Sequence, residues 1–124
     1  MGLKSPRGKF ERLDALLSAR IWRTPARTDP TVAATCRNLS ARGCRLRVED
    51  ERLVPGFDLE SPIYFAIQLE PAKPQISGAG QVVWMGRERG EALKVRAVFG
   101  VEFTWVSFSD RERIKAFIAS QVQA

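Results

Sequence analysis

The sequence NLSARG at residues 38–43 places an amide, a hydroxyl, a guanidinium and a glycine in one short segment. The Asn38 side-chain oxygen can accept a hydrogen bond, and the Ser40 hydroxyl can donate or accept one. Gly43 permits a backbone turn with positive φ and a close approach to the main chain. These groups suit the binding of a polar ligand, although asparagine, serine and glycine are also ordinary turn-forming residues.

The same residues do not form a recognisable catalytic or metal site. Activation of Ser40 as a nucleophile needs a neighbouring base, and the chain has no histidine and no paired lysine near it. Two thiols, Cys36 and Cys44, cannot complete a zinc site alone, and we expect them to be buried and reduced. The sequence therefore favours a binding protein, neither an enzyme nor a metalloprotein.

The composition indicates one soluble domain over residues 1–124, with 44% hydrophobic and 27% charged residues. No apolar run approaches the roughly 20 residues of a membrane helix, and no signal peptide is evident, so we expect a cytoplasmic protein. The formal net charge is +6, and residues 1–47 hold 11 basic residues against Glu11, Asp14 and Asp29. This excess favours an anionic partner (nucleotide, nucleic acid or membrane surface), although it also fits a solvated face.

Apolar alternation interrupted by turn residues about every ten positions predicts an all-β barrel or sandwich. The predicted strands cover residues 12–22, 31–36, 44–48, 63–69, 78–85 and 92–99, and residues 100–106 form a last strand or continue the sixth. The 38–43 loop then joins the second and third strands, with its side chains exposed. Trp84 and Trp105 could stack on guanine or on single-stranded bases, but their positions in alternating strands favour core or half-buried packing.

The spacing of apolar residues changes from that of a strand to that of a helix at the C-terminus, and it predicts a helix over residues 109–122 that covers the barrel. Ser109 and Glu112 have the spacing of a capping box, in which both side chains bond free amides of the first turn. One face of this helix is apolar and consists of Ile114, Phe117, Ile118 and Val122.

With these elements, the chain resembles the PilZ domains, which are bacterial receptors for cyclic di-GMP. The 38–43 loop matches the [D/N]xSxxG motif of that family. GQVVW at residues 80–84 and GVEFTWVSFSDRERIKAFI at residues 100–118 resemble the penultimate strand and the strand-to-helix ending of these domains. The resemblance implies a small six-stranded antiparallel β-barrel closed by a C-terminal α-helix, and a non-catalytic function in second-messenger signalling.

The implied ligand has two phosphodiester charges and two guanines, and each guanine offers N7 and O6 acceptors and N1–H and N2–H donors. Arginine can bind N7 and O6 bidentately, stack on a purine or hold a phosphate. In the loop, the Asn38 oxygen can accept from guanine, the Ser40 hydroxyl can bond phosphate or guanine, and Gly43 allows close approach.

PilZ domains also carry an RxxxR motif in a basic N-terminal segment. Arg23 and Arg27 have this spacing, but only 11 positions separate Arg27 from Asn38, and a complete strand must fit between the two motifs. Arg12 precedes Asn38 by 26 positions, which agrees with the usual interval of the family.

Gly8 stands where the first arginine of the motif is expected, with Arg7 and Lys9 on either side of it. We therefore expect residues 1–12 to be a flexible basic arm with a degenerate motif. The predicted ligand-binding residues are Arg7, Lys9, Arg12, Asn38, Ser40 and Gly43.

Three hypotheses follow. The first is a cyclic di-GMP receptor in which the ligand orders the arm and changes the surface that a downstream protein partner binds. The second is a PilZ-fold adaptor that has lost the ligand and acts through protein contacts. The third is a small basic barrel that binds single-stranded nucleic acid on stacked aromatic side chains.

Overall fold

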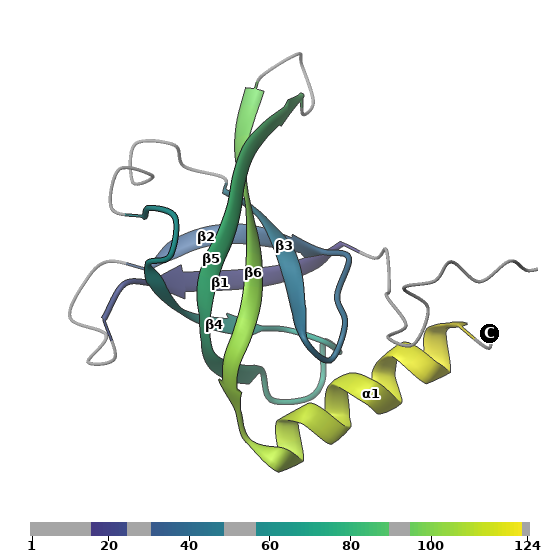
Figure 1. The fold of residues 1–124 in the computed structure, drawn as a ribbon. Helices are drawn as coiled ribbons and strands as arrows, with labels where there is room; N and C mark the ends of the chain where they lie inside the picture. The colour runs from purple at the N-terminus through teal and green to yellow at the C-terminus, as the bar shows by residue number, and fades with distance from the viewer. Residues whose placement is uncertain (1–15, 25–30, 49–56, 90–94, 123–124) are drawn as a thin grey trace, which may run out of the picture.

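Six antiparallel strands form a closed barrel in the computed structural model, which describes residues 16–24, 31–48, 57–89 and 95–122 (Figure 1). The strands are β1 (Leu17–Trp22), β2 (Val32–Arg37), β3 (Gly43–Val48), β4 (Pro62–Ile67), β5 (Ile76–Arg89) and β6 (Val95–Val106), and the helix is α1 (Phe108–Val122). Around the barrel the order is β1-β2-β3-β6-β5-β4. The predicted six-stranded antiparallel barrel with a C-terminal helix is confirmed.

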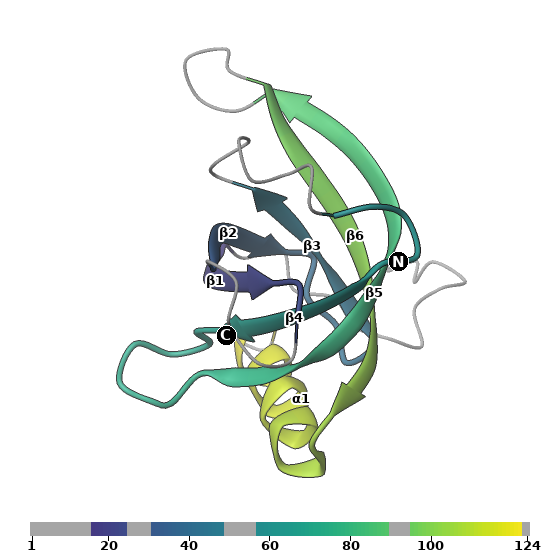
Figure 2. The same cartoon turned by 90° about the vertical axis from the view of Figure 1, so that its left-hand side faces the viewer.

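The last two strands are longer than the sequence pattern predicted. Residues 95–106 form one continuous strand, β6, which pairs with β5 from Gly78↔Val106 to Arg89↔Val95. Their far ends project beyond the barrel as a two-stranded ribbon (Figures 1 and 2). Gly86 lies between the predicted strands 78–85 and 92–99, but it belongs to β5, where a Cβ would meet the Trp84 ring at 2.6 Å.

Alternate residues of β2, β3 and β4 fill the barrel interior, as the period of two requires. Phe65 and Phe103 stack with ring centroids 4.8 Å apart, and Phe57 lies 5.6 Å from Phe99. The helix α1 lies against one end of the barrel (Figure 1). Its Ile114 and Ile118 are buried in the same hydrophobic core, and Phe117 packs against that core, so the predicted apolar face of the helix is confirmed for these residues.

The N-terminal cap of α1 differs from the prediction. The Ser107 hydroxyl, not that of Ser109, accepts a hydrogen bond from the amide of Asp110 at 3.1 Å, and the helix begins at Phe108. Glu112 forms an ion pair with Lys115 at 3.3 Å. The predicted Ser109–Glu112 capping box is therefore wrong, because Ser107, three positions before Asp110, caps the helix instead. Among the described residues, no helix combines the length and apolar character needed to cross a membrane.

Candidate functional site

The loop between β2 and β3 is the segment that the sequence singled out, and it turns sharply at Asn38. This residue has φ 51°, in the left-handed region, which asparagine tolerates better than most residues with a side chain. Leu39, which follows it, is fully buried and belongs to the barrel core. The loop is thus anchored by an apolar side chain, while Asn38 itself remains partly exposed.

Gly43 allows a close approach, as expected, but it does not make the expected turn with positive φ. None of the described glycines has positive φ, so Gly43 does not supply the left-handed turn. A Cβ on Gly43 would instead lie 2.2 Å from the backbone oxygen of Val101 on β6. Glycine is required here because the main chains of β3 and β6 approach closely, as Gly43 pairs with Glu102.

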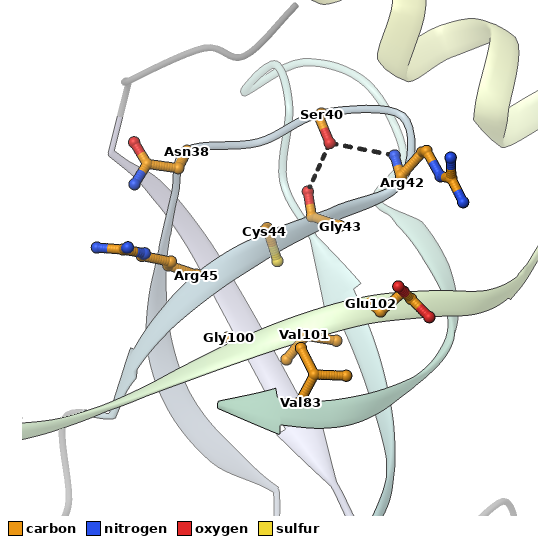
Figure 3. A pocket seen from close by; sticks show the side chains of 10 residues that line it. All are labelled: Asn38, Ser40, Arg42, Gly43, Cys44, Arg45, Val83, Gly100, Val101 and Glu102. Carbon is orange, nitrogen blue, oxygen red and sulfur yellow. Dashed lines mark hydrogen bonds between the residues drawn. The ribbon is translucent and has the colours of Figure 1, made fainter. Parts of the chain in front are cut away.

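Ser40 is 7% exposed, so the prediction of an exposed turn side chain is wrong for it. Its hydroxyl donates to the Gly43 carbonyl at 3.3 Å, and its oxygen accepts from the Arg42 amide at 3.2 Å (Figure 3). The Ser40 amide also donates to the Gly43 carbonyl at 2.9 Å. These bonds join residues of the loop to one another, so Ser40 helps to fix the loop conformation as well as lining the site.

Beside the loop lies an open pocket of about 290 Å³ on the outer face of the barrel. Figure 3 shows the Asn38 and Arg45 side chains near one end of it and those of Arg42 and Glu102 toward the other. Its lining residues are Asn38, Ser40, Arg42, Gly43, Cys44, Arg45, Val83, Gly100, Val101 and Glu102. The pocket joins three of the predicted site residues to side chains from β3, β5 and β6.

The charged side chains that line this pocket are Arg42, Arg45 and Glu102, and this excess of positive charge favours an anionic ligand. The Arg45 guanidinium lies 5.1 Å from the Trp84 ring centroid, and within the described part of the chain it has no carboxylate partner. Glu88 instead pairs with Arg37 at 2.7 Å and with Arg47 at 3.9 Å. A stacked arginine of this kind keeps its N–H donors available to phosphate or to a purine edge.

The two cysteines border the loop on β2 and β3, and both are free and buried, as predicted. The pKa of the Cys44 thiol is raised well above its ordinary value, mainly by a hydrogen bond with Cys36 and to a lesser extent by burial. Cys44 therefore stays protonated at neutral pH.

Three of the six predicted site residues, Asn38, Ser40 and Gly43, line the pocket together. Arg7, Lys9 and Arg12 lie outside the described residues, so their place relative to the pocket stays a prediction. Sequence reasoning missed several lining residues: Arg42, Arg45, Val83, Gly100 and Glu102. The alternation after Gly43 could have identified Arg45, since Cys44 and Leu46 are the buried positions of β3. No local sequence pattern indicates that Glu102 lines the pocket.

The tryptophans only partly follow the packing prediction. Trp84 is 43% exposed, and its ring covers Gly86 and lies beside Arg45. Trp105 is 61% exposed, so the prediction of core or half-buried packing is wrong for it. The adjoining β5–β6 register shift between Ala79 and Gly80 interrupts the regular alternation from which its burial was inferred.

Comparisons with known proteins agree with the geometry. A sequence model described as the PilZ domain matches residues 6–120. The structure is similar to the PilZ domain of Escherichia coli YcgR with c-di-GMP (TM-score 0.72, 11% identity, 92% of this chain and 90% of that one). No curated protein matches the chain.

Two further solved structures are larger proteins. Bacillus subtilis inhibitor of motility, MotI/DgrA, gives a TM-score of 0.72 at 17% identity over 98% of this chain and 54% of that one. The K. pneumonia MrkH–c-di-GMP complex gives 0.70 at 11% identity over 98% of this chain and 54% of that one. The chain thus spans about half the length of these two proteins, and at such identities the likeness shows a shared fold.

Proposed function

The chain belongs to the PilZ domain family, and from this premise we propose that it is a non-catalytic receptor for cyclic di-GMP. The observation that carries the proposal is the pocket in which the 38–43 loop, which includes Arg42, meets Arg45 and Glu102. This pocket combines hydrogen-bonding groups, guanidinium groups and an aromatic neighbour, which together suit a dianionic dinucleotide. The c-di-GMP complexes of YcgR and MrkH, two proteins of similar fold, support the choice of ligand.

Each part of the ligand has a matching group at this site. Arg45, stacked on Trp84, can take guanine N7 and O6 with both arms of its fork or hold a phosphate. The partly exposed Asn38 amide can accept from a guanine N–H, and the Glu102 carboxylate can accept from N1–H and N2–H. We propose that Ser40 mainly maintains the loop conformation, because its hydroxyl already donates one hydrogen bond and accepts another within the protein.

The N-terminal arm, residues 1–12, completes the proposed site with Arg7, Lys9 and Arg12. Ligand binding orders this arm against the barrel and changes the surface offered to a downstream protein partner. This coupling of ligand to surface is the proposed signalling step.

Calorimetric titration with cyclic di-GMP tests the proposal. We expect saturable binding, with a shallow dependence on salt, because a small dianion neutralises few charges and direct bonds to guanine remain. Cyclic di-AMP is the matched control. Adenine has an N6 donor in place of the O6 acceptor and lacks the N2 amino group, so we expect binding weaker by at least about tenfold.

Two other outcomes would replace the proposal. Tight binding of single-stranded DNA with a salt slope on the order of −0.7 per phosphate, and no response to cyclic di-GMP, would identify a nucleic-acid barrel. No response to either ligand would leave a PilZ-fold adaptor that acts through protein contacts.

The arm assignment has its own test, since the degenerate motif at Arg12 and the literal RxxxR at Arg23 and Arg27 compete for the same role. Arg12→Ala is expected to weaken cyclic di-GMP binding by about tenfold, the equivalent of one charge-assisted hydrogen bond. Arg27→Ala is the matched control, and we expect a change of less than about twofold, within the range of ordinary surface substitutions. A larger loss at Arg27 than at Arg12 would move the first motif to Arg23 and Arg27.

A further inference from the structure

The start of α1 is attached to the barrel by three side chains that bond backbone atoms. The Asp110 carboxylate accepts from the Ser77 amide at 3.1 Å. Arg113 donates from Nη2 to the Pro74 carbonyl at 2.7 Å, and Arg111 donates from Nη1 to the Ala41 carbonyl at 2.8 Å. Of these three bonds, the one from Arg111 ends in the 38–43 loop, 70 positions earlier in the chain.

The Ala41 carbonyl belongs to the same peptide group as the Arg42 amide. That amide donates to the Ser40 oxygen at 3.2 Å, so both polar ends of this peptide group have partners. The next carbonyl, that of Arg42, accepts from the Phe103 amide of β6 at 2.8 Å. A peptide group held at both ends has one orientation, and this orientation sets the direction in which the Arg42 side chain leaves the loop.

We propose that Arg111 is a positioning residue of the ligand site, although it does not line the pocket. A guanidinium-to-carbonyl bond is charge-assisted and partly buried here, so it holds the loop more firmly than a neutral bond does. Without it, the 41–42 peptide group can rotate, and Ser40 and Arg42 lose their fixed relation to the pocket. The ligand part of this inference rests on the proposed function.

The attachment has a reciprocal consequence. If Arg111 holds the loop in the conformation that binds ligand, then ligand must strengthen the attachment of α1 by the same coupling free energy. The C-terminal helix is then part of the receptor mechanism as well as a cover for the core.

Arg111→Met tests the role, because methionine keeps much of the side-chain length but cannot donate a hydrogen bond. Arg113→Met is the control, since it removes an exposed bond from the same helix to a carbonyl outside the loop, together with the ion pair between Arg113 and Asp110. We expect Arg111→Met to weaken cyclic di-GMP binding about tenfold, and Arg113→Met less than about twofold. Arg111→Lys should recover most of the affinity, because lysine restores a charged donor.

Hydrogen exchange without ligand supplies the readout that is independent of the proposed function. Arg111→Met should speed exchange at the Arg42 and Phe103 amides, whereas Arg113→Met should leave both at the wild-type rate. Wild-type exchange at these amides in Arg111→Met, or equal losses of affinity in the two methionine variants, would overturn the inference. If the unsubstituted chain fails to bind cyclic di-GMP, the proposed function fails, and the exchange rates still decide the role of Arg111.

Discussion

Gly43→Ala is expected to lower the free energy of unfolding by about 3 kcal/mol, the upper part of the range for an overpacked core position. The added Cβ would lie 2.2 Å from the Val101 backbone oxygen, and a backbone atom in a paired strand cannot rotate away. The start of β3 must therefore move away from β6, which disturbs the pocket floor and the attached loop. Urea unfolding followed by circular dichroism gives the stability, and titration gives the accompanying loss of cyclic di-GMP affinity.

Gly86→Ala is the matched control for this substitution. Its Cβ would also meet an atom at close range, but the nearest atoms belong to the Trp84 ring, 2.6 Å away. Trp84 is 43% exposed and its ring can turn toward solvent, so we expect a cost below about 1 kcal/mol. Equal losses in the two variants would mean that the contact with the β6 backbone is not what requires glycine at position 43.

Ser40→Ala is expected to cost about 2 kcal/mol of stability, because the part-buried Arg42 amide loses its acceptor and the Gly43 carbonyl loses the hydroxyl donor. The same change should weaken cyclic di-GMP binding by at least about tenfold, since the loop that bounds the pocket loses two of its internal hydrogen bonds. Thermal unfolding and calorimetric titration measure the two effects.

Ser109→Ala is the corresponding control, because Ser109 is exposed in the first turn of α1 and the cap belongs to Ser107. We expect it to change stability by less than about 0.5 kcal/mol. If Ser40→Ala also falls within that range and binds as the wild type does, the loop does not depend on its serine.

The strand and helix elements were largely predictable because their signals are local. Cys44, Leu46 and Val48 alternate with outward arginines in six residues of β3, and a period of two is enough to assign a strand. The capping residue of α1 was not predictable, since Ser107 and Ser109 each precede an acidic residue by three positions. A contact outside the helix separates the two candidates, because the Asp110 carboxylate bonds Ser77 on β5.

The 38–43 loop was predicted from residue types, but the roles of its members were not. Positive φ was assigned to Gly43, and the structure places it at Asn38. Ser40 was expected to face solvent, and it is buried with bonds to Arg42 and Gly43. Residue types indicate which bonds a turn can make, whereas the path of the neighbouring β6 strand decides which of them it does make.

The sequence alone determined the alternation that builds the barrel, the apolar face of the last helix and the loop at which polar groups gather, because each depends on neighbours within a few residues. The tertiary structure alone decided that Arg45, Glu102 and Val83 share a pocket with Asn38. It also decided that Arg111 bonds the loop from 70 positions away. These contacts depend on strand register and barrel closure, which are set by the packing of the whole core, and so no local pattern contains them.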